Sequence, residues 1–280
     1  MLECCKNEFD AKMQMQKYKK IYQVVQRIPK GDFLSYQEVA KLSGNIKLAR
    51  FIGNLMRKNR NPKIPCHRVI KNNGKVGGYK GSFKNSWEKA ALLLKEGAIG
   101  VIPTDTIYGI CGSALNKKAV EKIYKLKKRK PAKPMIILIA SLDDLKKFNI
   151  KLKNWQKKIL LKIWPAKISV ILPCPSKKFS YLHRGTKTLS FRIPAKSQLL
   201  KILKISGPLV APSANWEGFE PAKTISQAKK YFGNKVFYYN DGGELIGPAS
   251  TLVDLTKKPV KILRKGADYQ TIKLIKNINI

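Results

Sequence analysis

Apolar and polar positions along this chain follow one pattern before about residue 98 and another after it. In the first part, apolar residues recur every three to four positions, which is the spacing of one face of an α-helix. This spacing predicts a helix over about 12–28, which ends where Pro29, Lys30 and Gly31 interrupt it. The first part is therefore predicted to be mostly helical.

A pair of short helices is predicted next. Ser35 and Glu38 stand at the spacing of a capping box, in which the serine hydroxyl and the glutamate carboxylate each accept a hydrogen bond from a free backbone amide. The helix that begins there is expected to reach about Leu42, and a third helix is expected over about 47–58, after Gly44. Two short helices joined by a tight turn indicate a helix-turn-helix arrangement.

After residue 98, short runs of β-branched and apolar residues alternate with helical segments. This alternation predicts an α/β domain with a large mixed, twisted sheet and flanking helices. The predicted strands are 98–102, 134–140, 168–172, 188–193, 208–211, 235–239, 250–255 and 260–263, and the predicted helices are about 117–128, 142–148, 152–163, 196–204 and 225–232.

The composition is that of a globular chain in a reducing compartment. A length of 280 residues suffices for two domains, and an apolar content of 44% excludes wholesale disorder. The five cysteines are scattered without the spacing of a disulfide framework or a zinc site. We find no signal-peptide pattern and no uninterrupted apolar stretch of membrane-spanning length, so a cytoplasmic location and no membrane partner are expected.

The formal net charge of +40 suggests a polyanionic partner. A binding surface should be local, however, and this charge divides into +14 over residues 1–97 and +26 over 98–280, which is nearly the same density. The charge alone therefore leaves two alternatives equally open, a nucleic-acid partner and a lysine-rich composition.

Residues 64–69, with the sequence IPCHRV, contain the first candidate for chemistry. A thiol at its ordinary pKa is mostly protonated at neutral pH, and a neighbouring histidine or cation can raise the thiolate fraction. Because adjacent residues on a strand point to opposite faces, the adjacency of Cys66 and His67 proves little. Judged from these residues alone, an inert core cysteine is the favoured interpretation.

The wider segment, over about 18–85, resembles the DNA-repair domain of O6-alkylguanine-DNA alkyltransferases, with PCHRV at 65–69 as the specific motif. The resemblance implies a winged helix-turn-helix fold and the irreversible transfer of an alkyl group from double-stranded DNA to Cys66. It also implies that His67 is the base, acting through a water. By the same resemblance, the DNA-binding residues would be Tyr36, Arg50, Asn59, Arg68, Tyr79 and Gly81.

The family's Cys–His–Glu relay has Glu96 as its candidate glutamate, which lies about three residues too far from Tyr79. The residues alone favour other interpretations, with Tyr36 in the core, Arg50 as a solvated charge and Gly81 in a turn. An alternative therefore stays open, in which residues 1–85 are a DNA- or tRNA-binding module with an unused cysteine.

A second candidate site begins at Pro103, where a predicted strand ends in Thr104, Asp105 and Thr106, followed by a predicted glycine-rich turn and a helix. Three basic residues follow that helix and would suit a polyphosphate. No Walker A or GxGxxG pattern is present. The residues alone favour a solvated, lysine-rich surface. The three basic residues are Lys127, Arg129 and Lys133.

Residues 87–267 resemble the Sua5/YrdC/YwlC domain, the L-threonylcarbamoyladenylate synthases. The resemblance rests on PTDTIYG (103–109), Lys127 with Arg129, SFRIP (190–194), APSAN (211–215), STLVDL (250–255) and ILRKG (262–266).

This resemblance implies that L-threonine, bicarbonate and ATP give threonylcarbamoyl-AMP and pyrophosphate, for t6A formation on tRNA. It implies Mg²⁺ on the phosphates, no prosthetic group, and possible partners in tRNA and the t6A-transfer machinery. A relative that binds double-stranded RNA or tRNA without synthesis is the alternative. Lys127 and Arg129 would be catalytic; Arg129, Lys133, Thr188, Asn215, Thr224 and Arg264 would bind ATP; and Thr104, Thr106, Arg192, Ser213 and Ser250 would bind threonine.

The expected organisation has four parts. These are a tail over 1–17, an alkyltransferase-like domain over 18–97, a synthase-like domain over 87–267, and a second tail over 268–280. Residues 86–97 are expected to form one helix that both domains share.

Overall fold

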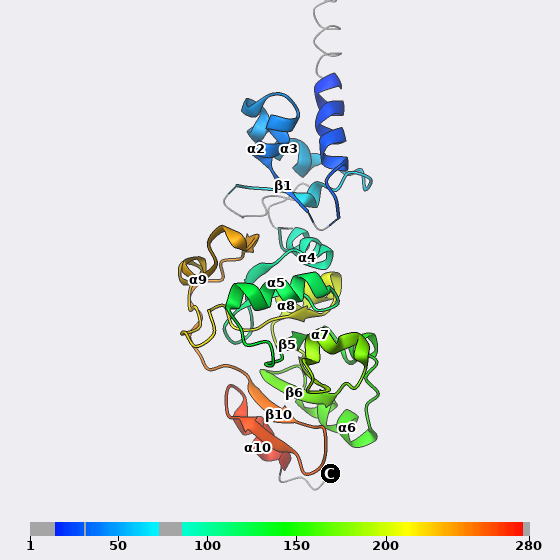
Figure 1. Cartoon of the computed structure of the whole chain (residues 1–280), viewed down its shortest axis with the longest axis vertical. Helices are drawn as coiled ribbons and strands as arrows, with labels where there is room; N and C mark the ends of the chain where they lie inside the picture. Colours follow the sequence, from blue (N-terminus) through cyan, green and yellow to red (C-terminus); the bar gives the residue numbers. More distant parts are fainter. Residues whose placement is uncertain (1–14, 31, 73–85, 277–280) are drawn as a thin grey trace, which may run out of the picture. The chain divides into compact units, whose positions relative to one another are not determined.

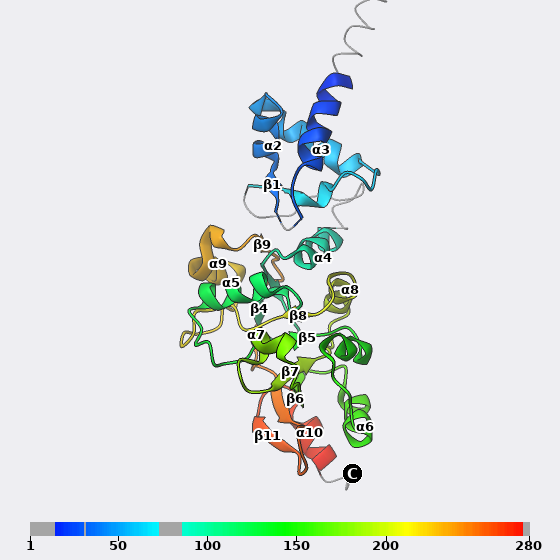
Figure 2. The same cartoon turned by 45° about the vertical axis from the view of Figure 1, so that its right-hand side comes forward.

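A computed structural model of the chain describes residues 15–30, 32–72 and 86–276 (Figures 1 and 2). The chain divides into two compact units, Met1–Leu93 and Leu94–Ile280, and the division falls inside helix α4 (Ser86–Glu96). Among the described residues, no helix combines the length and the apolar character that a membrane span requires.

The first unit is mostly helical, as predicted. Its described elements are a helix over 15–26, β1 (Leu34–Ser35), α2 (Tyr36–Leu42), the 3-10 helix η1 (Ile46–Leu48), α3 (Ala49–Lys58), the 3-10 helix η2 (Cys66–Arg68), β2 (Val69–Ile70) and α4. β1 and β2 pair in parallel, and the core between the helices includes Ile21, Val25, Val39, Ile52 and Met56.

The capping box at the start of α2 is confirmed. The Ser35 hydroxyl accepts from the Glu38 amide at 3.1 Å, and the Ser35 amide donates to Glu38 Oε2 at 2.5 Å. Gly44 follows the helix at a φ of +94°, a conformation that a side chain would strain. Helix α3 begins at Ala49, two residues later than predicted, because residues 46–48 form a 3-10 turn that Asn45 caps.

The described part of the second unit contains a nine-stranded mixed sheet in the order β11-β10-β6-β7-β5-β8-β4-β3-β9. The strands are β3 (Gly100–Pro103), β4 (Tyr108–Ser113), β5 (Ile136–Leu138), β6 (Ile168–Pro173), β7 (Thr188–Arg192), β8 (Leu209–Val210), β9 (Tyr238–Tyr239), β10 (Thr251–Asp254) and β11 (Lys261–Arg264). The helices are α5 (Lys117–Lys127), η3 (Leu142–Phe148), α6 (Asn154–Ile163), η4 (Lys177–Phe179), α7 (Ser180–His183), α8 (Ser197–Ser206), α9 (Ile225–Phe232), η5 (Gly233–Lys235) and α10 (Tyr269–Lys276).

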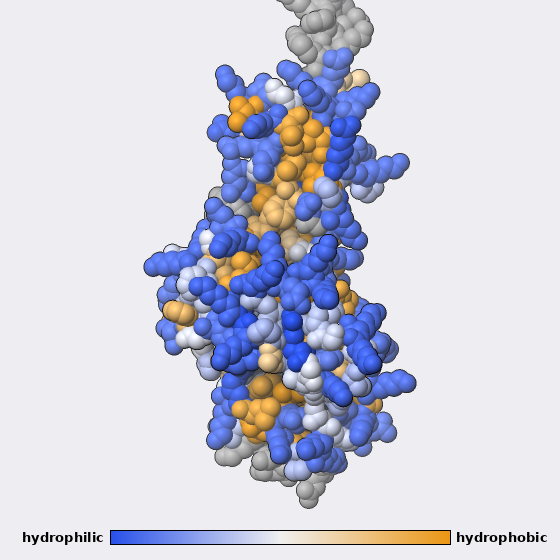
Figure 3. Space-filling view, viewed as in Figure 1, coloured by the Kyte–Doolittle hydropathy of each residue, from blue (hydrophilic) through white to orange (hydrophobic). Residues whose placement is uncertain are grey.

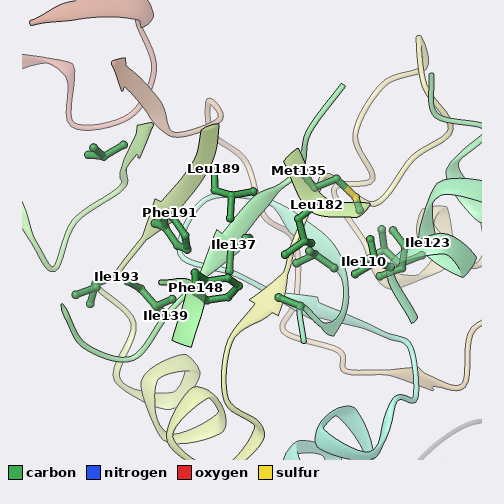
Figure 4. Packing of buried hydrophobic residues seen from close by; sticks show 14 of the residues in the cluster. Ile110, Ile123, Met135, Ile137, Ile139, Phe148, Leu182, Leu189, Phe191 and Ile193 are labelled. Atoms are coloured by element: carbon green, nitrogen blue, oxygen red, sulfur yellow. The ribbon is translucent and has the colours of Figure 1, made fainter. Parts of the chain in front are cut away.

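Alternation along β7 separates the main hydrophobic core from a cavity on the other face of the strand. Leu189 and Phe191 pack into the core with Ile137 and Phe148 (Figure 4), and the rings of Phe148 and Phe191 lie 5.1 Å apart. The alternate residues of the strand, which include Thr188 and Arg192, line the cavity on the other face. The face of the molecule in Figure 3 is mostly hydrophilic, in keeping with the 57 lysines and arginines of the sequence.

The glycine-rich turn predicted after Thr106 is wrong, because strand β4 occupies that segment, antiparallel to β3. Its glycines permit close packing: a Cβ at Gly109 would lie 3.2 Å from Thr104 Cγ2, and one at Gly112 would lie 3.1 Å from Ile123 Cδ1.

Three further elements differ from the prediction. Residues 142–148 form a 3-10 helix, and α7 was not predicted. Residues 268–280, expected as a tail, include helix α10, whose Ile272 is buried in the core.

Candidate functional site

Eight of the predicted ligand-binding residues meet in one cavity of the second unit, with a volume of about 500 Å³. The turn between β3 and β4, strand β7, and the segments 129–136, 211–213 and 249–252 each supply part of its lining. The eight residues are Thr104, Thr106, Arg129, Thr188, Arg192, Ser213, Ser250 and Arg264.

The turn that carries Thr104 and Thr106 is fixed by its own hydrogen bonds. The buried Thr104 hydroxyl donates to the Ile107 carbonyl at 2.6 Å and lies 3.1 Å from the Thr106 hydroxyl. Gly109, just beyond, forms an isolated β-bridge with Ser213. One wall of the cavity is therefore held in place by a rigid hairpin.

Arg192 is a buried cation whose charge Asp105 offsets. Its Nη2 lies 3.0 Å from Asp105 Oδ1, and the two side chains are only 4% and 3% exposed. Asp105 Oδ2 also accepts from the Ala195 amide at 3.1 Å. Burial lowers the pKa of the Arg192 guanidinium and Asp105 opposes this shift. The sequence analysis named Asp105 within the PTDT motif but assigned it no role, because its partner lies far along the chain.

Arg264 and Ser250 lie together at another part of the lining. Arg264 Nε donates to the Ser250 carbonyl at 2.9 Å, and its Nη2 donates to Ser250 Oγ at 3.2 Å. Ser250 Oγ also lies 2.8 Å from Ser169 Oγ, so both side chains are oriented by the sheet.

Lys127 is buried behind the cavity, not among its lining residues. Its ammonium donates to the Ser213 carbonyl at 2.5 Å and to the carbonyl and side-chain oxygens of Asn215 at 2.7 and 3.1 Å. Burial, together with Arg129, lowers the pKa of Lys127 to about 7. Lys127 thus joins the end of α5 to the segment 213–215, and Ser213 Oγ donates to Asn215 Oδ1 at 2.6 Å.

Two of the predicted ATP ligands, Arg129 and Lys133, lie on the segment 129–134. Arg129 donates from Nε to the Lys133 carbonyl at 3.0 Å and from Nη2 to the Pro134 carbonyl at 2.9 Å. Lys133 pairs with Glu217 at 2.7 Å. Thr224 caps α9 by accepting from the Gln227 amide, and it is not among the cavity-lining residues.

A second constellation surrounds Cys66 in the first unit. Cys66 begins η2 and is 4% exposed. Asn59, at the end of α3, donates from Nδ2 to Cys66 Sγ at 3.1 Å and to the Asn61 carbonyl at 3.2 Å. Asn59 therefore fixes the turn before the cysteine and touches the sulfur itself.

Lys89 is a buried ammonium beside the same thiol. It donates to the Val69 carbonyl, lies 3.5 Å from the Tyr36 hydroxyl and is fully buried. Burial raises the pKa of Cys66, whereas Asn59 and Lys89 lower it. Burial also lowers the pKa of Lys89 to about 7 and, with Cys66, raises that of Tyr36 to about 12. The sequence interpretation missed Lys89, whose only signal is a lysine before the apolar run AALLL.

The other predicted residues of this unit are placed separately. Arg50 is exposed on α3, and Arg68 donates from Nη1 to the Ile28 carbonyl at 2.8 Å. His67 is half-buried in η2, and Glu96 falls in the second compact unit. Tyr79 and Gly81 lie outside the described residues. Within the described ranges, no group of three or more His, Cys, Asp or Glu side chains could hold a metal ion.

Family models match both parts of the chain. The Sua5/YciO/YrdC model, described as telomere recombination, matches residues 92–266. A model of the DNA-binding domain of 6-O-methylguanine DNA methyltransferase matches residues 16–98.

Curated relatives and solved structures agree with the first of these. The threonylcarbamoyl-AMP synthase of Pyrococcus abyssi is 33% identical over 179 residues, which are 63% of this chain and 53% of that protein. The Bacillus subtilis protein of the same name is 32% identical over 181 residues, which are 64% of this chain and 52% of that protein. This chain thus spans about half the length of these relatives.

The solved structure of P. abyssi Sua5 with L-threonine aligns with a TM-score of 0.62 and 32% identity over 66% of this chain and 55% of that one. Escherichia coli YciO shares the fold, with a TM-score of 0.60 and 21% identity over 68% of this chain and 94% of that one. The chain therefore belongs to the Sua5/YciO/YrdC family, and its residues 16–98 are in addition similar to the DNA-binding domain of 6-O-methylguanine DNA methyltransferase.

Proposed function

We propose that the second unit is a threonylcarbamoyl-AMP synthase. The observation that carries this proposal is the single cavity of about 500 Å³ in which three arginines and a set of threonine and serine hydroxyls converge. Relatives with this name match the same part of the chain, and one of them was solved with L-threonine. Arginines suit carboxylate and phosphate oxygens, and the hydroxyls suit a small polar amino acid.

In this proposal the two ends of the cavity have different tasks. Arg192 binds the threonine carboxylate, and the Thr104 and Ser213 hydroxyls orient the rest of the amino acid. Arg129, Lys133 and Arg264 bind the phosphate chain of ATP, which brings its own Mg²⁺ as part of the substrate. Lys127, which does not line the cavity, acts indirectly by fixing the segment 213–215.

The reaction then needs positioning more than acid–base chemistry. Threonine and bicarbonate give N-carboxythreonine, whose carboxylate oxygen attacks the α-phosphorus of ATP while the bond to the β-phosphate breaks and pyrophosphate leaves. Holding both reactants in one cavity makes the attack effectively unimolecular. The fixed arginines offset the charge that develops on the phosphate oxygens.

The test is threonine-dependent release of pyrophosphate from ATP in the presence of bicarbonate. We expect Arg129→Ala and Lys127→Ala to abolish it, and Lys125→Ala, an exposed neighbour on α5, to leave it unchanged. Release that does not depend on threonine, or full activity in Arg129→Ala, would contradict the proposal.

We propose a second function for the first unit, alkyl transfer from double-stranded DNA to Cys66 on a winged helix-turn-helix domain. The specific observation is the contact of Asn59 and the buried Lys89 with the surroundings of this thiol, since both favour the thiolate. His67 would act as the base, and Glu96 remains the candidate to complete the relay. A DNA- or tRNA-binding module without transfer is the alternative.

One mass measurement distinguishes alkyl transfer from binding without transfer. The full chain is incubated with duplex DNA that carries one O6-methylguanine, and the intact mass and a peptide map are taken. Alkyl transfer predicts one added methyl group at Cys66 that is absent in Cys66→Ala. DNA that binds without any mass change would leave only the binding module.

A further inference from the structure

One acidic side chain lies among the basic residues of the segment 129–134. Glu217 Oε1 lies 2.7 Å from Lys133 Nζ, and its Oε2 accepts from the Lys130 amide at 2.5 Å. An ammonium and a backbone amide that converge in this way are donors typical of a phosphate site. With Arg129 nearby, these contacts lower the pKa of Glu217 to about 2, so the group is a carboxylate at neutral pH.

A backbone hydrogen bond and a cation–π contact hold the loop that carries Glu217 against this segment. The Glu217 amide donates to the Lys127 carbonyl at 2.8 Å, and the Lys128 ammonium lies 4.0 Å from the centre of the Trp216 ring. Trp216 in turn packs on Tyr231, with ring centroids 5.5 Å apart. The backbone position of Glu217 is therefore fixed by the fold, and its side chain is 18% exposed.

The contacts adjoin residues that line the cavity. Arg129 and Pro134, on either side of Lys130 and Lys133 in the sequence, both line it. A polyphosphate that reached Arg129 and continued along this segment would meet the donors that Glu217 now occupies.

We propose that the Glu217 carboxylate occupies the donors that bind the outer phosphates of a polyphosphate. It must leave the Lys130 amide and the Lys133 ammonium when ATP or pyrophosphate binds. This inference rests on the proposed function, which puts the phosphate chain of ATP on Arg129 and Lys133. Two anions cannot share the donors without repulsion, so the carboxylate weakens the binding of both ligands. A nucleoside monophosphate, which has no outer phosphates, does not compete with it.

A consequence for the reaction follows. Once pyrophosphate has left, the carboxylate returns to Lys130 and Lys133 and opposes rebinding. Glu217 thereby lowers inhibition by pyrophosphate, while it leaves the adenylate end of the product untouched.

The test uses Glu217→Gln, which keeps the shape and removes the charge. Its matched control is Glu220→Gln, an exposed acid in the same loop. Calorimetry on the full chain measures the binding of ATP, pyrophosphate and AMP. We expect Glu217→Gln to bind ATP and pyrophosphate about tenfold more tightly. AMP binding should stay within about twofold, and Glu220→Gln should change nothing.

A double-variant cycle locates the effect. In a Lys133→Ala background, the gain from Glu217→Gln should fall to about threefold or less, because the masked ammonium is gone. Unchanged or weaker ATP binding in Glu217→Gln, or an equal gain for AMP, would overturn the inference alone. Failure of the unsubstituted chain to bind either ATP or pyrophosphate would overturn the inference together with the proposed function.

Discussion

Single buried charges lie at both candidate sites, and each has a partner that lies far away in the sequence. Asp105 offsets Arg192 across 87 positions, and Lys89 lies beside Cys66 across 23. Sequence motifs predicted the cavity-lining arginines and hydroxyls, which carry recognisable neighbours along the chain. They did not predict Asp105 or Lys89, because burial and pairing arise only when distant strands and helices come together.

Asp105 is a positioning residue for Arg192, and its charge is expected to matter more than its shape. Asp105→Asn keeps an acceptor for the Ala195 amide but leaves Arg192 buried without a counter-charge. We expect the KM for threonine to rise at least about tenfold, with the KM for ATP changed less than about twofold. Steady-state kinetics check this, with the exposed Asp143→Asn as the control. Equal increases in both KM values would contradict a role at the threonine end.

Lys89 is expected to set the pH dependence of Cys66. Its charge lowers the pKa of the thiol, so Lys89→Met should raise that pKa and slow methyl transfer near neutral pH. Because the pKa of Lys89 is about 7, the two pH profiles should differ most near pH 6.5 and converge toward pH 9, which shifts the profile of the variant to higher pH. Rates of methyl transfer from a methylated duplex between pH 6.5 and 9 measure the shift, with Lys95→Met as the exposed control on α4. A uniform loss at every pH would indicate a merely structural role.

At the scale of elements, local capping signals were predictable and buried strands were less so. The capping box of α2 needs only residues three apart, and the sequence located it correctly. Strand β4 was not predicted, because its two glycines indicate a turn when the sequence is considered alone. In the fold, the same glycines allow close approach to Thr104 and α5, which only the tertiary packing explains.

Removal of the Ser35 hydroxyl should loosen α2 without disturbing the second unit. Ser35→Ala leaves the Glu38 amide without its acceptor, at a cost of about 1 kcal/mol. Hydrogen exchange of peptides covering α2 should become about fivefold faster, while Lys41→Ala, an exposed site in the same helix, should have little effect. Unchanged exchange in Ser35→Ala would show that packing alone holds the helix.

At the scale of the whole molecule, the two proposed activities belong to different compact units. We therefore expect Cys66→Ala to keep full threonine-dependent pyrophosphate release, and Arg129→Ala to keep methyl transfer. Both assays on both variants form a complete cross-test. Loss of pyrophosphate release in Cys66→Ala would show that the two units are coupled.

The buried Lys127 gives the second unit a pH-dependent stability. Its pKa in the fold is about 7, against an ordinary 10.5, so between pH 7 and 9 the unfolded chain binds more protons than the folded one. The free energy of unfolding should therefore rise with pH over this window, by up to about 1.4 kcal/mol per pH unit. Lys127→Met should remove that slope, and the exposed Lys125→Met should retain it. Urea unfolding at pH 7, 8 and 9 provides the measurement.

The hairpin of β3 and β4 gives the cavity one wall whose shape is fixed by the fold. All residues of both strands are buried, and the Thr104 hydroxyl closes the turn between them, so the pocket proposed for threonine would exist before its ligand arrives. Residues 130–133, between the cavity-lining Arg129 and Pro134, are by contrast exposed, and Lys133 among them pairs with Glu217. In the proposed function, the amino acid would thus be selected by its fit to a preformed pocket, whereas ATP would bind only after displacing Glu217 from Lys130 and Lys133.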